Sequence, residues 1–346
     1  MKYLPPLDGL RGLAVLLVLG IHAQCAAFGG GFLGVDIFFV LSGYLITSLL
    51  LHEHAETGRI DFGAFYVRRA LRLLPALVLT LVLAVLMEWH RGHLTRYEIV
   101  RNVAAALFYV GNWVRALTDI SLSKLDHTWS LSIEEQFYLV WPGVFWWLMR
   151  WGKPSRVIKL LSAGILSIAL YRAWLYWPDH FARVYFGFDT RVDAMLSGCL
   201  LACLLYWQRL PEAARWSALT RWLWLPLLLA FAWLVGSSDY GQARYPLGLF
   251  TVVALGTALV IAEITLRPTG WLARSLCFTP LRYVGKLSYG LYLYHFVIFS
   301  TTPPPIPQPI PARQLADFVA TFALAAVSYH FIEQPCLRLK TRWQRV

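Results

Sequence analysis

The chain has 346 residues, of which 58% are hydrophobic and 14% are charged. Soluble domains contain roughly 45–50% apolar and about 25% charged residues, so this composition excludes an ordinary globular protein. Apolar runs long enough to cross a bilayer recur from end to end, and the 16 tryptophans and 17 tyrosines suit membrane interfaces. We therefore expect an all-α polytopic membrane protein, with residues 1–346 forming a single membrane-embedded domain.

The net charge of +12 does not indicate nucleic-acid binding. The basic residues cluster between apolar runs, where positive charge orients a membrane protein, and no nucleic-acid motif accompanies them. The five cysteines lie in or beside apolar runs without metal-ligand spacing, and we interpret them as small buried residues. P-loop, Rossmann and GxSxG motifs are missing from the sequence, so we expect no metal site and no tightly bound cofactor.

Loop charge predicts the topology. The apolar runs define candidate spans at residues 9–28, 31–51, 70–89, 129–149, 158–177, 189–207, 222–237, 244–264, 284–301 and 313–333. If the further apolar run at 103–117 does not cross, most basic loops fall on the side of the N-terminus, and that side is cytoplasmic by the positive-inside rule. We expect ten spans, both termini in the cytoplasm, and a re-entrant or surface helix at 103–117.

Arg11 and His22 lie in the first span, with ten uncharged residues between them. Eleven residues of α-helix turn through about 1100° and rise roughly 16 Å, so both side chains point to one face at different depths. Ionisable groups within a span usually face a protein interior or a water-filled cavity and indicate function. A snorkelling arginine and a packing histidine explain each residue alone, but not their common face.

Asp36 is expected beside His22. The glycine turn at 29–31 makes the first two spans antiparallel neighbours, which brings Asp36 to a depth similar to that of His22. A carboxylate bonded to one imidazole nitrogen fixes the tautomer and makes the other nitrogen the base. We therefore predict that Asp36 orients His22; the alternative is an unrelated packing aspartate.

Three arginines, Arg68, Arg69 and Arg72, open the third span in the segment FYVRRALRLLP (65–75). Arg69 and Arg72 are three residues apart and share a helix face. Guanidinium groups bind phosphates in a bidentate manner, so the cluster is a candidate phosphate site. The positive-inside signal explains any one of these arginines, but explains less well why Arg72 lies within the span.

Two further spans begin with polar residues on the expected outer side. The fourth opens with Trp129, Glu134 and Glu135, and the sixth opens with Asp189 and Arg191. Helix capping by hydroxyls, with acids in the first turn, explains the former locally, and mutual charge neutralisation explains the latter. Together these residues are candidates for an opening on the outer side.

Several segments in chain order resemble the acyltransferase family 3 membrane proteins of bacteria. They are LDGLRGLAVLLVLGIHA (7–23), GVDIFFVLSGYLIT (34–47), FYVRRALRLLP (65–75), HTWSLSIEEQFYLVWP (127–142), the Asp-x-Arg-x-Asp at 189–193, SYGLYLYH (288–295) and IEQP (332–335). The resemblance covers essentially the whole chain. The Arg-x10-His spacing and the WSLxxEEQFY block are its most specific parts.

The resemblance implies a ten-helix enzyme of the bacterial inner membrane. It would move an acyl group, usually acetyl, from acyl-CoA on the cytoplasmic side to a hydroxyl of a glycan, a lipid-linked sugar or another extracytoplasmic acceptor. Some relatives carry an additional C-terminal hydrolase-like domain. Because this chain ends at residue 346 with a basic tail, we expect a stand-alone form.

The resemblance also implies roles for residues. Arg11 and His22 would be catalytic, and Arg69 and Arg72 would handle the donor, with Arg68 beside them. His22 would act either as the base for the acceptor hydroxyl or as a transient acyl carrier. The alternative function is a transporter or flippase for a lipid-linked sugar, but the internal repeat common in transporters is not detected in the sequence.

Overall fold

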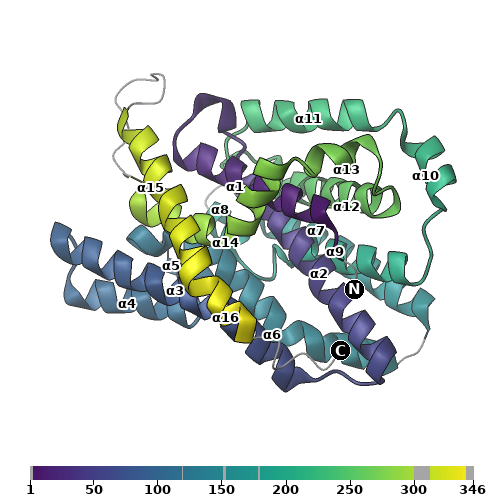
Figure 1. Ribbon diagram of the computed structural model, residues 1–346, viewed down its shortest axis with the longest axis horizontal. Helices are drawn as coiled ribbons and strands as arrows, with labels where there is room; N and C mark the ends of the chain where they lie inside the picture. The colour runs from purple at the N-terminus through teal and green to yellow at the C-terminus, as the bar shows by residue number, and fades with distance from the viewer. Residues whose placement is uncertain (1–2, 119, 151–152, 178–179, 300–311, 340–346) are drawn as a thin grey trace.

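The computed structural model describes residues 3–118, 120–150, 153–177, 180–299 and 312–339. Over these residues the structure consists of helices and contains no strand (Figure 1), which confirms the all-α class. The helices are α1 (Pro5–His22), η1 (Ala26–Phe28), α2 (Leu33–Thr57), α3 (Phe62–Arg91), α4 (Arg96–Leu107), α5 (Gly111–Thr118), η2 (Ser123–Thr128), α6 (Trp129–Arg150), α7 (Pro154–Leu175), α8 (Phe181–Phe186), α9 (Val192–Tyr206), α10 (Ala213–Thr220), α11 (Trp224–Ser237), η4 (Tyr245–Leu249), α12 (Phe250–Leu266), α13 (Trp271–Leu276), α14 (Thr279–Ile298), α15 (Ala312–Ser328), η5 (Tyr329–Glu333) and α16 (Gln334–Leu339).

The centre of the bundle is built from α1, α2, α9 and α14, which pack closely because glycines lie where they cross. A Cβ atom on Gly43 of α2 would stand 1.9 Å from the carbonyl oxygen of Met195 on α9. On the opposite side, a Cβ on Gly285 of α14 would stand 1.8 Å from the carbonyl oxygen of Asp8 on α1. Small residues at helix crossings let backbones approach within a membrane, where packing drives association.

Several helices are long and apolar enough to cross a membrane, so the chain is a multi-pass membrane protein. Six pass by length and composition among the described residues, namely α1, α2, α3, α7, η4 with α12, and residues 314–339. The pair α10 and α11, bent by 59°, would make a seventh if it forms one span. Each of the ten expected spans overlaps a helix. The number of ten crossings and the side of each terminus remain predictions.

The ambiguous apolar run at 103–117 does not form one helix. It is divided between α4, with 12 residues, and α5, with 8 residues. The break falls at Tyr109, whose backbone is left-handed with φ +54°. A membrane-crossing helix needs about 20 residues, so neither piece reaches across by itself. In Figure 1, α4 lies along α3, with which it is in contact.

Candidate active site

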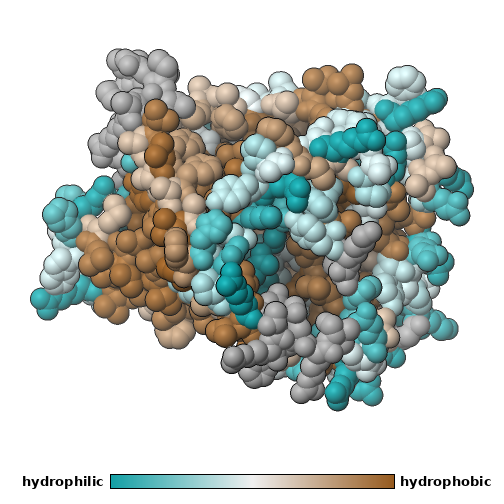
Figure 2. Space-filling view, viewed as in Figure 1, coloured by the Kyte–Doolittle hydropathy of each residue, from teal (hydrophilic) through white to brown (hydrophobic). Residues whose placement is uncertain are grey.

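A cavity of about 70 Å³ lies among α1, α2, α3, α6 and α14. Its polar lining comes from residues far apart in the sequence: Arg11, Ser42, Arg69, Arg72, Ser130, Glu134, Tyr138, Ser288, Tyr289 and Tyr292. Figure 2 shows that the face drawn there is hollowed near its middle and that hydrophilic side chains gather in the hollow. A group of polar side chains at the centre of an apolar bundle is a candidate site for a charged substrate.

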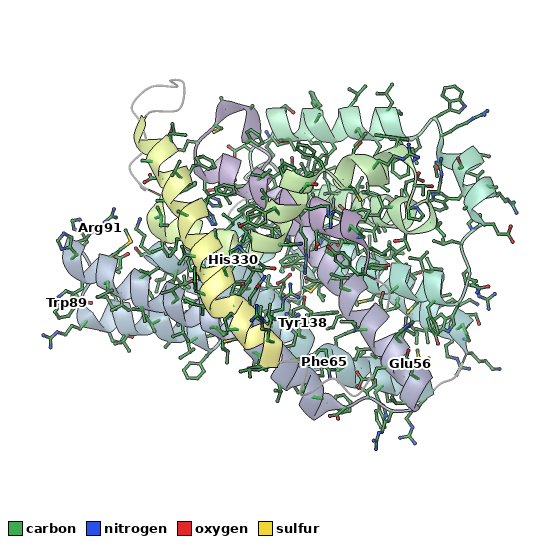
Figure 3. All side chains as sticks on the ribbon, viewed as in Figure 1. Glu56, Phe65, Trp89, Arg91, Tyr138 and His330 are labelled. Carbon is green, nitrogen blue, oxygen red and sulfur yellow. The ribbon has the colours of Figure 1, made fainter. Side chains whose placement is uncertain are left out.

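Arg69 is held by α6. Its Nη2 donates to Glu135 at 2.8 Å, and its guanidinium lies 3.5 Å from the centre of the Tyr138 ring (labelled in Figure 3). Arg68 instead forms an ion pair with Glu53 at 3.4 Å and does not line the cavity. The three arginines of the segment 65–75 therefore have different surroundings.

Arg11 and Arg72 both line the cavity. Among the described residues, neither has a carboxylate within the 4.0 Å of an ion pair, although the charges of Arg11 and Glu333 both act on Arg72. Glu134, on the opposite wall, accepts a hydrogen bond from Ser42 at 2.5 Å. Two guanidinium groups that face one cavity repel each other, and an anion between them would relieve that repulsion.

Three histidines from different elements meet at the C-terminal end of α1. The Nδ1 of His22 lies 3.3 Å from the Nε2 of His295 on α14, and the two ring centres are 4.9 Å apart. The ring of His127, on η2, lies 5.4 Å from that of His295 and stacks on Phe296 at 5.0 Å. Burial lowers the pKa of the His127 imidazole, so it is neutral at pH 7. Within the described part of the chain, no group of three or more His, Cys, Asp or Glu has the arrangement of a metal site.

Tyr292 connects the cavity with the histidines. It lines the cavity together with Ser130, and its hydroxyl lies 2.5 Å from the Ser130 hydroxyl. It also donates to the carbonyl of His127 at 2.9 Å, and its ring centre is 5.6 Å from that of His295. One wall of the arginine-lined cavity is therefore a side chain that also touches the histidine cluster.

Asp36 does not orient His22, and that prediction is wrong. Its Oδ1 accepts a hydrogen bond from the Nη2 of Arg191 at 2.9 Å, and both side chains are fully buried. Arg191 also lies 3.6 Å from the centre of the Phe250 ring. The expectation failed because α9 packs against α2 and supplies an arginine, which is a stronger partner for a buried carboxylate than a neutral imidazole.

The residues expected at one outer opening lie in different surroundings. Glu134 lines the cavity and Glu135 pairs with Arg69, whereas Trp129 is buried against Phe39, Tyr185 and Phe186. Asp189 pairs with Arg183, and Arg191 pairs with Asp36. Trp129 and Arg191 nevertheless both contact the ring of Tyr185, so these two lie close together, and an opening on the outer side remains a prediction.

Sequence reasoning missed a second buried ion pair. Arg172 of α7 is 0% exposed and donates to Asp193 at 2.8 Å, to the Thr190 carbonyl at 2.7 Å and to Thr251 at 2.6 Å. Its Nε donates to the Pro246 carbonyl at 3.2 Å, so one guanidinium joins α7, α9 and η4–α12. The available signal was an arginine near the C-terminal end of an otherwise apolar run, about one turn before the helix ends.

Comparisons with known proteins identify the family of the chain. A family model described as an acyltransferase domain matches residues 5–330. The chain is 38% identical to the peptidoglycan O-acetyltransferase OatA of Listeria monocytogenes, over 96% of this chain and 56% of that protein. It is 37% identical to the putative peptidoglycan O-acetyltransferase YrhL of Bacillus subtilis, over 96% of this chain and 55% of that one. It is 35% identical to the O-acetyltransferase OatA of Staphylococcus aureus, over 96% of this chain and 57% of that one.

The chain spans about half the length of these curated relatives. No solved structure matches it. The family model nonetheless covers α1 to α15, and with them the cavity, Arg11 and the histidine cluster. The chain therefore belongs to the family that this acyltransferase domain defines.

Proposed function

We propose that the chain is an O-acyltransferase of the bacterial inner membrane. It takes an acyl group, usually acetyl, from acyl-CoA on the cytoplasmic side and passes it to a hydroxyl of a cell-envelope glycan. Family membership supports the class of reaction, and the relatives named as peptidoglycan O-acetyltransferases favour peptidoglycan or its lipid-linked precursor as the acceptor. The observation that carries the proposal is the cavity that joins Arg11 and Arg72 to the histidine cluster through Tyr292.

The donor side is assigned to the cavity arginines. Acyl-CoA carries several phosphates, and Arg72 faces the cavity without an ion-pair partner among the described residues. Arg69 is already held by Glu135 and Tyr138, so it positions the neighbouring wall and meets the ligand only if that pair opens. Ligand pockets usually measure about 300–1,000 Å³, so the cavity of about 70 Å³ must widen to admit a pantetheine arm.

The chemical step is assigned to His22, with Arg11 nearer the donor. As a base, the unprotonated nitrogen of His22 takes the proton of the acceptor hydroxyl while the hydroxyl oxygen attacks the thioester carbonyl. The C–S bond then breaks, and the CoA thiolate takes the proton from His22. As an acyl carrier, the same nitrogen attacks the thioester carbonyl, the C–S bond breaks and the CoA thiolate leaves. The acceptor hydroxyl then attacks the acyl-imidazole, the acyl–nitrogen bond breaks, and the hydroxyl proton goes to the CoA thiolate. In either route Arg11 acts on the donor within the cavity and not on the carbonyl that reacts at His22, because it lies about three helical turns away along α1.

A reconstituted transfer assay tests the proposal. The purified protein in lipid nanodiscs is given acetyl-CoA labelled in the acetyl group and a soluble muropeptide, and the muropeptide is analysed by mass spectrometry. We expect an added ester mass that is lost on mild alkaline treatment and is missing with His22→Ala. Labelled acetyl-CoA that is neither hydrolysed nor used with any glycan acceptor would contradict the proposal and would favour transport without chemistry.

A further inference from the structure

The hydrogen bonds around His295 determine which nitrogen of His22 is free to react. His295 is fully buried on α14, and its Nδ1 lies 2.7 Å from the carbonyl oxygen of Tyr292 and 3.2 Å from that of Leu291. Carbonyl oxygens only accept hydrogen bonds, so this Nδ1 carries the proton. The Nε2 of neutral His295 therefore holds a lone pair, and it faces the Nδ1 of His22 at 3.3 Å.

The same reasoning applies to His22. Its Nδ1 lies 2.8 Å from the carbonyl oxygen of Val18, which again requires a proton on that nitrogen. That proton is shared between the Val18 carbonyl and the lone pair of His295 Nε2. The remaining nitrogen of His22, Nε2, is then the one with a lone pair, as a base or a nucleophile requires.

We infer that His295 is a positioning residue, which holds His22 in the tautomer with Nδ1 protonated and stabilises the imidazolium formed when His22 Nε2 takes a proton. The inference rests on the proposed role of His22 in acyl transfer. Catalytic histidines are commonly oriented by a carboxylate, but Asp36 is committed to Arg191. Here a second imidazole occupies the orienting position, on a helix that packs directly against α1.

Other titratable groups lie on the elements that pack around the pair. His127 and Lys124 come from η2, and Lys124 donates to the Phe299 carbonyl at 3.1 Å. Tyr292 comes from α14 itself. Asp317, on α15, lies one turn after Gln314, whose amide donates to the Ala23 carbonyl. Of these groups, His127 acts electrostatically on His295 together with His22. Asp317 is the acid against which the role of His295 must be tested.

The test compares three substitutions in the transfer assay with acetyl-CoA and a muropeptide. His295→Phe keeps a ring of similar size but removes the lone pair, and we expect kcat to fall by about 100-fold or more with little change in KM for acetyl-CoA. His295→Gln places an amide oxygen near the position of Nε2, and we expect it to recover activity to within about tenfold of the wild type. The exposed His330, which lies 3.2 Å from the Tyr283 hydroxyl (labelled in Figure 3), gives the matched control His330→Gln with unchanged kinetics.

The pH profile separates positioning from a purely structural role. An acceptor at Nδ1–H favours the imidazolium, so its removal in His295→Phe should move the acidic limb of kcat/KM to lower pH. Asp317→Asn should leave that limb unchanged. The inference is overturned if the acidic limb of the kcat/KM profile shifts in Asp317→Asn but not in His295→Phe. It is also overturned if His295→Phe has a normal kcat per folded molecule.

The tautomer of His22 can also be measured without an activity assay. In ¹⁵N-histidine-labelled protein, the signals assigned to His22 by their loss in His22→Gln should report a proton on Nδ1 and none on Nε2. His295→Phe should change the proportion of the two tautomers. If the tautomer is as inferred but no transfer occurs, the proposed function fails and only the tautomer that His295 imposes on His22 stands. A His22 signal with Nε2 protonated overturns the inference whatever the activity.

Discussion

Replacement of Asp36 by asparagine should destabilise the protein. Asp36 is 0% exposed and its partner Arg191 is 1% exposed, with 2.9 Å between the bonded atoms. At an effective dielectric constant of about 20, two unit charges at that separation attract each other by roughly 6 kcal/mol. Removal of one partner of a buried pair costs about 3–5 kcal/mol, because the other charge is left uncompensated.

The lower end of that range applies to Asp36→Asn. Asparagine keeps a carbonyl oxygen for the Nη2 of Arg191, and the Phe250 ring still lies under the guanidinium. Against this, the Nε and Nη1 of Arg191 have no hydrogen-bond partner among the described residues, so the uncompensated charge has no second acceptor there. We therefore expect a loss of about 3 kcal/mol, or roughly 4 °C in apparent melting temperature for a chain of 346 residues.

The assay follows monomeric protein in detergent by fluorescence-detected size-exclusion chromatography after heating. The double variant Asp36→Asn with Arg191→Gln removes both charges and should regain most of the lost stability. Turnover per folded molecule of Asp36→Asn should stay within about tenfold of the wild type, because Asp36 is not bonded to His22. If Asp36→Asn is as stable as the wild type but has no turnover, this reasoning is refuted and Asp36 takes part in the reaction.

Three further predictions follow from the same contacts. Arg172→Met removes a fully buried guanidinium and should lower the free energy of unfolding, measured with a chemical denaturant, by about 3–5 kcal/mol. The control Arg183→Met, at the partly exposed pair with Asp189, should lower it by less than about 1 kcal/mol. Equal losses would contradict the assigned role of Arg172. Arg72→Gln should raise KM for acetyl-CoA by about tenfold or more, and added salt should weaken the binding of acetyl-CoA to the wild type. Arg68→Gln, outside the cavity, should have a smaller effect on KM. An unchanged KM in Arg72→Gln would mean that Arg72 serves only to orient the chain in the membrane. A membrane-impermeant thiol reagent on intact cells should label Ser121→Cys but not Ser155→Cys, both exposed, and the reverse pattern would invert the predicted sides of α6 and α7.

The sequence was sufficient for features that depend on one segment at a time. Apolar length predicted a helix at every expected span, because a buried or lipid-facing backbone must satisfy its own hydrogen bonds. Arg72, which the sequence carries into a span, lines a polar cavity within the bundle, and its expected role in binding phosphate remains a prediction. The helical spacing from Arg11 to His22 correctly indicated two depths on one helix, since Arg11 lines the cavity and His22 meets the other histidines.

Features that depend on which helices are neighbours could not be predicted in this way. Periodicity shows which residues share a face of one helix, but not that α9 would place Arg191 beside Asp36, 155 residues earlier. In the same way, the sequence did not show that Glu135 on α6 would form an ion pair with Arg69 on α3. His295 could be identified from the sequence as an ionisable residue within a span, but its partner lies 273 residues away.

The most direct test of the account is single-turnover transfer by the purified protein and by His22→Ala, at matched amounts of folded protein. Acetyl-CoA labelled in the acetyl group is mixed with enzyme and muropeptide, and released CoA and acetylated muropeptide are both quantified. The account predicts equal amounts of the two products with the wild type, and neither product above background with His22→Ala. Transfer by His22→Ala at the wild-type rate would contradict the assignment of the reaction to the histidine cluster.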